Sequence, residues 1–280
     1  MVDQRIAEHS YAYGTYLAAM TAGLIAAGAW GYGALYALMF GSLIWLTQRR
    51  VGAPTWRNQA TELAFFAVTM NVSFQAMAGA IPAIREQRYD ALLLGLESRL
   101  VGGSVNVWAE RFVTPAATEF LSACYLIFFP LLLVSLLRYF FRQKELLANF
   151  YRGLFTVYGI GFLGYALVPA SGPWLAYPEL FGVALDGGPI TRLNQAIVVA
   201  GSNGVDVFPS LHCAVTAYIL GFARRHHPRE FRWLLVPVAG LWCSTIYLRY
   251  HYLVDVLCGF LLAALALSIT RRRPVAVPAG

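Results

Sequence analysis

Long apolar stretches separated by short polar segments run along the whole chain. Most of them approach the ~20 residues that a helix needs to cross a bilayer. Continuous apolar runs of this length are typical of membrane-spanning helices and not of strands or surface helices. The pattern therefore predicts an all-α polytopic integral membrane protein. The stretches cover residues 11–47, 63–84, 113–137, 153–170, 208–223, 233–248 and 251–270.

The first stretch decides the number of spans. Residues 11–47 would form about 55 Å of helix, which is too long for one upright span. Gly31-Tyr32-Gly33 can bend or break a helix in this stretch. The chain has about six spans if the stretch is one tilted or partly interfacial helix, and seven if it is two. Six is favoured, because two spans joined at 31–33 would leave the second one short.

Composition supports the membrane class. Hydrophobic residues make up 59% of the chain and charged residues only 12%, whereas a soluble domain has about 25% charged residues. The net charge of +7 could indicate nucleic-acid binding, but the cations lie at the ends of the apolar stretches and form no single patch. Membrane topology explains them, so no nucleic-acid partner is expected. The four cysteines lie within apolar stretches at no metal-like spacing, which predicts buried apolar side chains.

The distribution of cations predicts the orientation. By the positive-inside rule, the span ends that carry most of the Lys and Arg are cytoplasmic. The opposite ends carry Pro209, His212 and His251, so this group faces the extracytoplasmic side of a plasma or inner membrane. The cytoplasmic set is Arg49, Arg50, Arg57, Arg138, Arg142, Lys144, Arg152, Arg224, Arg225, Arg229, Arg232, Arg271, Arg272 and Arg273.

Two extracytoplasmic connections have their own structure. Residues 91–101 have the apolar spacing of an amphipathic helix, with Glu97 and Arg99 together on its polar side, which suits a helix lying in the interface. Residues 171–207 form a long connection, and a loop of that length is often a lid over a functional site. Its turn signals are Gly187-Gly188-Pro189 and Asn203-Gly204.

No repeat or linker divides the chain. Residues 1–280 are therefore expected to form a single membrane-embedded domain, with a motif core at 153–270 and a disordered tail at 274–280.

His251 and Asp255 form the first candidate for chemistry. At positions i and i+4 they share a helix face, so Asp255 can accept a hydrogen bond from one imidazole nitrogen of His251. The other nitrogen is then directed at an electrophile, which is the arrangement of an activated nucleophile. The alternative is a buried polar pair that joins two helices. Because ionisable residues within membrane spans are costly, the catalytic interpretation is favoured.

Pro209-Ser210-Leu211-His212 forms the second candidate. Pro209 suits the first position of a helix, which would leave the amides of Ser210, Leu211 and His212 without intrahelical partners. Such amides bind anions, and the Ser210 hydroxyl adds a donor. His212 would face the same anion and give a proton to a leaving oxygen. The alternative is a helix cap with an interfacial histidine.

Arg249 completes the candidate site. It lies two residues before His251, and its guanidinium offers donors that match phosphate oxygens. The alternative is an arginine that extends to the interface from a helix end. An anion site, an oriented nucleophilic histidine, a second histidine and an arginine together predict phosphoryl transfer through a phosphohistidine. This chemistry needs no metal and no cofactor.

The motifs resemble those of the type-2 phosphatidic acid phosphatase superfamily of membrane lipid phosphatases, which shares its core with vanadium haloperoxidases. Residues 209–212 match the family motif P-S-G-H with Leu211 in place of Gly. Residues 244–255 match S-R-x5-H-x3-D at Ser244, His251 and Asp255, but Thr245 replaces the Arg. Arg249 lies one turn from Thr245 and could present its guanidinium from the same helix face if the helix runs that far.

The departures from the family pattern indicate a branch. The motif K-x6-R-P is absent, and the only lysine, Lys144, lies on the cytoplasmic side. F-P-S-L-H followed by H-Y-x2-D resembles the inositol phosphorylceramide synthase group and its bacterial relatives. Residues 169–173 and 90–115 resemble that group too. The resemblance implies that phosphate binding relies on the backbone amides of Ser171 and Gly172 and on Arg192.

The predicted function is thus cleavage or transfer of a lipid-linked phosphate. The partners are a lipid phosphate, membrane lipid and, for transfer, the hydroxyl of a polyol or a lipid. Hydrolysis and head-group transfer both remain open, because they differ only in the second nucleophile. A transporter or lipid-binding protein that uses the same polar pocket is the non-catalytic alternative. A metal site made by His212, His251 and Asp255 is a further one, which activity insensitive to chelators would exclude.

Overall fold

The computed structural model describes residues 9–53 and 55–270, and within these ranges the fold is all-helical. The prediction of an all-α protein is therefore confirmed. The helices, in chain order, are α1 (His9–Ala26), α2 (Trp30–Gly52), α3 (Trp56–Ile84), α4 (Asp90–Val101), α5 (Val105–Ala109), η2 (Glu110–Phe112), α6 (Pro115–Leu126), α7 (Phe128–Phe141), α8 (Lys144–Leu167), α9 (Pro173–Ala176), η3 (Pro178–Leu180), α10 (Pro189–Gly201), α11 (Leu211–His226), α12 (Pro228–Tyr247) and α13 (Leu253–Ile269).

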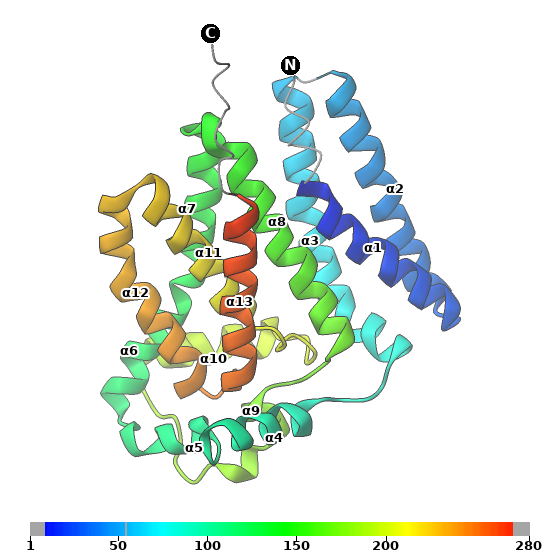
Figure 1. Cartoon of the computed structure of the whole chain (residues 1–280). Helices are drawn as coiled ribbons and strands as arrows, with labels where there is room; N and C mark the ends of the chain where they lie inside the picture. Colours follow the sequence, from blue (N-terminus) through cyan, green and yellow to red (C-terminus); the bar gives the residue numbers. More distant parts are fainter. Residues whose placement is uncertain (1–8, 54, 271–280) are drawn as a thin grey trace.

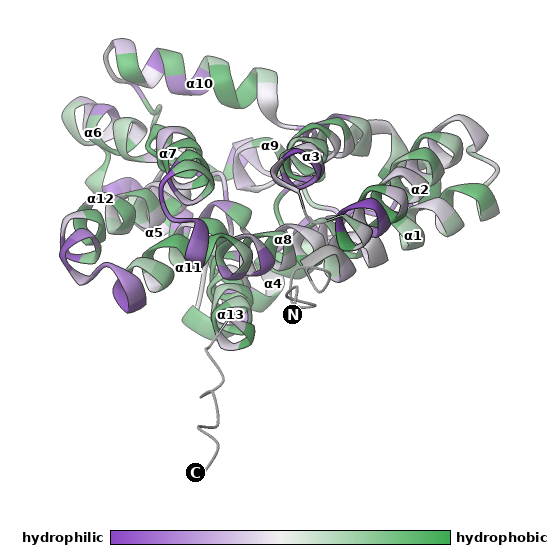
Figure 2. Ribbon diagram, turned by 90° about the horizontal axis from the view of Figure 1, so that it is seen from above, coloured by the Kyte–Doolittle hydropathy of each residue, from purple (hydrophilic) through white to green (hydrophobic). Residues whose placement is uncertain are grey.

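Helix α8 lies at the centre of the bundle. It contacts α1, α3, α7, α11 and α13. Seen along the bundle, α1 and α2 lie on one side of α3 and α8, and α6 and α12 lie on the other (Figure 2). Helices α4 and α5 lie across one end of the bundle, where α13 begins and α3 and α8 end (Figure 1). The motif residues at the starts of α11 and α13 are thereby brought to one end of the molecule.

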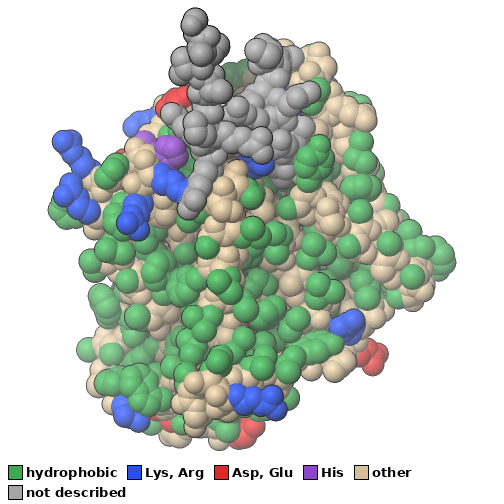
Figure 3. Space-filling view, in the orientation of Figure 1, with side chains coloured by type: hydrophobic (Ala, Val, Ile, Leu, Met, Phe, Trp, Pro, Cys, Tyr) green, Lys and Arg blue, Asp and Glu red, His purple; other side chains and the backbone are tan. Residues whose placement is uncertain are grey.

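The outer surface suits a membrane. Apolar side chains cover the middle of the face in Figure 3, while charged side chains lie toward its two ends. Three helical segments are long and apolar enough to cross a bilayer, namely 56–84, 115–141 and 144–167, and Leu253–Ile269 is a shorter apolar helix. An integral membrane protein is supported, whereas the number of six spans stays a prediction.

The first apolar stretch contains two helices, so the single tilted helix favoured from the sequence is wrong. The break lies at residues 27–29, before Gly31. Gly28 has φ +75°, a left-handed conformation that glycine adopts without steric cost, and the amide of Ala29 donates to the carbonyl of Leu24. These features end α1, and α2 then packs against it.

The stretch predicted at 113–137 is also divided. Helix α6 ends at Leu126 and α7 begins at Phe128. Pro130 has no N–H to donate to the carbonyl of Leu126, and its ring crowds that carbonyl, so a regular helix is disfavoured at this point. The break matters because Tyr125 and Phe128 both border the site described below.

Helix α4 is present as predicted, but its orientation is the reverse of the expected one. Glu97 is fully buried, together with Leu93, whereas Leu92, Leu96 and Leu100 are exposed. Glu97 accepts hydrogen bonds from backbone amides inside the protein, which explains why a carboxylate faces inward. The helix therefore directs an apolar face outward, as a helix lying in a membrane interface does.

Candidate active site

His251 and Asp255 form the hydrogen bond that their spacing predicts. His251 Nδ1 lies 2.8 Å from Asp255 Oδ2, and both side chains are buried. His251 precedes α13 and is not part of it, while Asp255 lies in the first turn. The bond to Nδ1 leaves Nε2 as the nitrogen available to a substrate. The backbone here is held by Asn106, whose Nδ2 donates to the carbonyls of Ile246 and His251.

The Pro-Ser-Leu-His segment starts α11, but two residues later than predicted. Ser210 is the N-cap and Leu211 is the first helical residue, so Pro209 is not part of the helix. Ser210 is fully buried, and its Oγ accepts a hydrogen bond from the amide of Cys213. Leu211 and His212 still occupy the positions whose amides have no intrahelical partner.

A backbone contact joins the two motifs. The amide of Ser210 donates to the carbonyl of Asp255 at 3.0 Å. The helices can approach this closely because residue 259 is glycine: a Cβ at Gly259 would lie 2.5 Å from the carbonyl oxygen of Ser210. Segments that are far apart in the sequence thus meet through backbone atoms, which fixes the separation of the two catalytic candidates.

His212 faces His251 across the site. Their ring centroids lie 5.7 Å apart. The hydroxyl of Tyr125 lies 3.1 Å from His212 Nε2, and the Phe128 ring packs 4.5 Å from the imidazole, centroid to centroid. Tyr125 could not be identified from the sequence, because it is one aromatic residue inside an apolar stretch with no motif around it.

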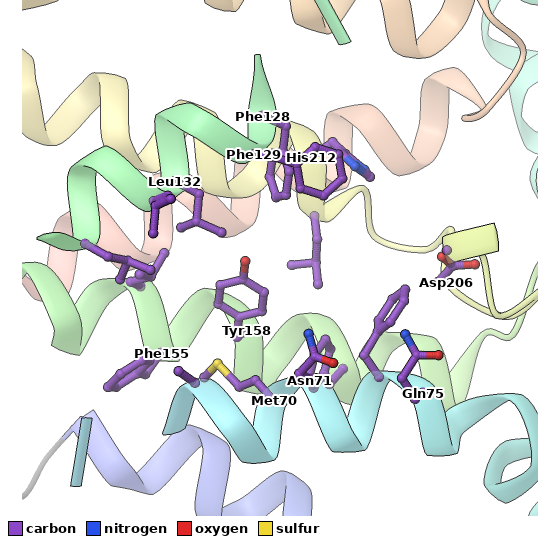
Figure 4. Close-up of a pocket in the computed structure, with 18 of the residues that line it drawn as sticks. Met70, Asn71, Gln75, Phe128, Phe129, Leu132, Phe155, Tyr158, Asp206 and His212 are labelled. Carbon is purple, nitrogen blue, oxygen red and sulfur yellow. The ribbon is translucent and has the colours of Figure 1, made fainter. Parts of the chain in front are cut away.

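Both histidines line a cavity of about 760 Å³. Its walls come from α3, α7 and α8 and from the connection before α11, and most of its lining is apolar (Figure 4). The polar side chains in the wall include Asn71, Gln75 and Asp206. Among the described residues that line the cavity there is no Lys or Arg. A bound phosphate would therefore meet no cationic side chain except a protonated histidine.

Arg249 lies outside this cavity. Helix α12 ends at Tyr247 and Arg249 has φ +66°, so it does not share a helix face with Thr245, and that interpretation is wrong. Its guanidinium donates to Glu110 at 2.9 Å and to a backbone carbonyl, and it lies 4.2 Å from the centroid of the Phe181 ring. Arg249 as a phosphate ligand stays a prediction that requires the guanidinium to leave Glu110.

The backbone amides proposed as phosphate ligands already hold an internal anion. The amides of Ser171 and Gly172 both donate to the carboxylate of Asp90 at 3.0 Å. Gly172 has φ +84°, and a Cβ there would lie 2.5 Å from the carbonyl oxygen of Tyr250. This loop is therefore packed tightly against the turn that carries His251. Arg192 is exposed on α10 and does not line the cavity.

Four carboxylates from residues 90–119 hold the loops at this end of the bundle. Each accepts hydrogen bonds from backbone amides of other segments, and for the buried Asp90 and Glu97 these bonds offset the removal of the carboxylate from water. The pairs are Asp90 with Ser171 and Gly172, Glu97 with Val105 and Leu253, Glu110 with Gly182 and Val183, and Glu119 with Ile190 and Thr191.

A metal site was one alternative for His212, His251 and Asp255. Throughout the described ranges, no three His, Cys, Asp or Glu side chains come together as a possible set of metal ligands. His251 Nδ1 and Asp255 Oδ2 are bonded to each other, and His212 contacts Tyr125. The geometry is that of a histidine bonded to a carboxylate and facing a second histidine.

The sequence is similar to those of known proteins. The model of the PAP2 superfamily matches residues 91–269, a region that contains α4, both histidines and Asp255. Phosphoinositol dihydroceramide synthase of Bacteroides thetaiotaomicron is 28% identical over 188 residues, which cover 58% of this chain and 56% of that protein. The chain thus matches a little over half the length of this relative. No solved structure matches the chain.

Proposed function

The chain belongs to the PAP2 superfamily, and from this membership we propose that it is a membrane enzyme that transfers a lipid-linked phosphate group through a phosphohistidine. The motif resemblance described above is confirmed by the family match and by the similarity to a phosphoinositol dihydroceramide synthase. The observation that carries the mechanism is the bond from His251 Nδ1 to Asp255 Oδ2, with the ring of His212 at 5.7 Å.

In the first step, His251 Nε2 attacks phosphorus. Asp255 keeps the proton on Nδ1, so the lone pair of Nε2 is available, and it stabilises the positive charge that develops on the ring. The N–P bond forms as the bond between phosphorus and the leaving oxygen breaks. Protonated His212 gives its proton to that oxygen as general acid.

In the second step, an alcohol or water attacks the phosphorus bound to His251. Neutral His212 now accepts the proton of the attacking hydroxyl, the new P–O bond forms and the N–P bond breaks. Both histidines return to their starting states. The overall reaction needs neither a metal nor a cofactor, and it exchanges one oxygen substituent on phosphorus for another.

Transfer of a phospho-head group is favoured over hydrolysis of a phosphomonoester. A phosphodiester carries one negative charge, whereas a phosphomonoester carries about 1.5–2 at neutral pH. The described lining of the cavity contains no Lys or Arg to balance a second charge. The relative is named for the synthesis of a phosphoinositol lipid. Both observations support a phospholipid donor and a lipid or polyol alcohol as acceptor.

The proposed site opens on the extracytoplasmic side. Helices α3 and α8 end, and α11 and α13 begin, at the same end of the bundle (Figure 1). The opposite end carries Arg138, Arg152, Arg224 and Arg225 in or near the helix termini. The positive-inside rule assigns that end to the cytoplasm.

The test uses purified full-length protein in detergent with a chelator. Phospholipids and lipid phosphates are supplied with and without an alcohol acceptor, and wild type is compared with His251→Ala. We expect transfer of the head group by wild type, no activity in His251→Ala, and an acid-labile, base-stable phosphoryl adduct trapped on wild type alone. Activity that survives in His251→Ala contradicts the mechanism, and no turnover of any lipid by wild type favours a transport or lipid-binding role.

A further inference from the structure

Helix α3 contributes two carboxamides to the cavity wall. Asn71 and Gln75 lie one turn apart and point into the cavity, toward the side that holds His212 and Asp206 (Figure 4). Within the part of the chain that the structure describes, neither side chain has a hydrogen-bond partner. Both residues are exposed and line the cavity, so their amide groups are free to donate hydrogen bonds to a ligand in the cavity and to accept them from it.

Asp206 borders the same space from a different segment. Its Oδ1 accepts a hydrogen bond from Ser202 Oγ at 3.1 Å. The loop is fixed to α3 by Asn203, whose Nδ2 donates to the carbonyl of Phe74 at 2.8 Å. Because Phe74 directly precedes Gln75, this bond positions the loop of Asp206 beside the two carboxamides. The three side chains thus belong to one wall, although Asp206 lies more than 130 positions after Asn71 and Gln75 in the sequence.

The chemistry of these groups defines what they can bind. A carboxylate only accepts hydrogen bonds, and phosphate oxygens do the same, so a phosphate beside Asp206 would be repelled. The described lining has no Lys or Arg to offset that repulsion. A ligand group beside Asp206 must therefore be a donor, and one beside Asn71 and Gln75 can both donate and accept. Neutral hydroxyl groups meet both requirements.

The lining of the cavity changes from apolar to polar along its length. Leu132 and Phe155 lie at one end of it and Asp206 at the other, with Asn71 and His212 between them (Figure 4). A phospholipid placed with phosphorus at the histidines would extend its hydrocarbon chains toward Leu132 and Phe155. Its polar substituent would then lie near Asp206.

We propose that Asn71, Gln75 and Asp206 bind the hydroxyl groups of a neutral polyol head group attached to the reacting phosphorus, and so select the phospholipid donor. This inference rests on the proposed function. The inference assigns specificity for the donor lipid to residues of α3. This helix lies outside residues 91–269, which the family model matches. Vicinal hydroxyls could also come from a hydroxylated lipid backbone, and the experiment below separates the two sources.

Binding is measured in full-length protein that carries His251→Ala, so that no lipid turns over. The probes are phosphatidylinositol, phosphatidic acid with the same chains, and a lipid phosphate with an amide and a hydroxyl in its backbone but no polyol. Asn71→Leu combined with Gln75→Leu removes both carboxamides at similar side-chain size. Thr69→Val is the matched control, because Thr69 lies on the same helix, its hydroxyl donates to carbonyls of that helix and it does not line the cavity.

The double variant should bind phosphatidylinositol roughly tenfold more weakly, as the loss of one or two neutral hydrogen bonds predicts. Its affinity for the other two lipids should change by less than about threefold, and Thr69→Val should match the parent with all three. Unchanged affinity for phosphatidylinositol, equal losses for all lipids, or a selective loss of the amide lipid would overturn the proposal. Selective polyol binding in a protein whose wild type transfers nothing would instead reject the proposed function and leave this site standing.

Discussion

The carboxylate of Asp90 holds the backbone amide of Ser171, whose nitrogen lies 3.0 and 3.1 Å from the two carboxylate oxygens. The amide of Gly172 and the hydroxyl of Tyr252 donate to the same carboxylate. An internal anion therefore occupies the amides that the sequence suggested for phosphate. In this structure the Asp90 carboxylate fixes the 171–174 loop against the turn that precedes α13.

Asp90→Asn should destabilise the protein. The charge-assisted bonds to Ser171 and Gly172 are lost, and an amide NH₂ can face the two backbone donors, which costs about 2–3 kcal/mol. Tyr252→Phe removes only one of the donors and should cost about 1 kcal/mol. Thermal unfolding in detergent compares the two variants with wild type. An Asp90→Asn protein as stable as wild type would contradict this account of the loop.

Asp255→Asn should lower kcat by about 10²–10⁴-fold with little change in KM, because the variant no longer orients His251 or stabilises its charge. Ser268→Ala serves as the control, since Ser268 lies on the same helix and bonds only to the carbonyl of Leu265. Initial rates over a range of lipid concentrations separate kcat from KM. If both variants keep wild-type kcat, the pair of His251 and Asp255 is structural.

Tyr125→Phe tests the position of His212. The variant keeps the ring beside His212 but loses the hydroxyl that lies 3.1 Å from Nε2. We expect about a tenfold loss with an alkyl leaving group, whose oxygen needs a proton, and a much smaller loss with a nitrophenyl leaving group. Equal losses with both leaving groups would indicate that Tyr125 only supports packing.

Transfer should decline in acid as Asp206 becomes protonated. Desolvation by the surrounding protein raises the pKa of Asp206 above its ordinary value, although the hydrogen bond from Ser202 and the nearby His251 oppose this. The carboxylate that accepts hydroxyl hydrogen bonds is present above that pKa and is lost as the pH falls through it. The decline therefore begins at a higher pH than for an ordinary Asp, whose pKa is about 3.9.

The ratio of the transfer rate with phosphatidylinositol to the rate with a phospholipid whose head group has no hydroxyls, measured between about pH 4 and pH 8, isolates this effect, because both donors react at the same two histidines. Asp206→Asn should have a lower ratio and no acid decline. A ratio that is independent of pH in wild type would exclude a role for the ionised carboxyl of Asp206 in head-group binding.

The orientation can be tested at Asp186, an exposed residue in the connection before α10. A cysteine introduced by Asp186→Cys should react with a membrane-impermeant thiol reagent added outside intact cells. The protein without the substitution measures any labelling of the native cysteines. Among the described residues, Cys243 is the only exposed one of these. Labelling that requires disrupted cells would place the site on the cytoplasmic side.

Local features of the site followed from the sequence because they depend on short chain segments. The spacing of four between His251 and Asp255 brings their side chains together once a helix starts nearby. The start of the helix that carries His212 was predicted to within two residues, because proline favours the first position of a helix. The membrane class followed from apolar runs whose length is set by the bilayer.

The tertiary structure decided the features that depend on packing between distant segments. Helix α4 buries Glu97 because amides of two other segments lie beneath it, and no periodicity within α4 encodes those partners. Arg249 bonds to Glu110 because the chain turns sharply after α12. Tyr125 and Asn71 reach the site only through the packing of α6 and α3, so no local pattern marked them. The sequence by itself determined the class of the protein, the His251–Asp255 pair and the position of His212. Packing determined which groups surround a substrate, because contacts between residues far apart in the chain depend on how whole helices fit together.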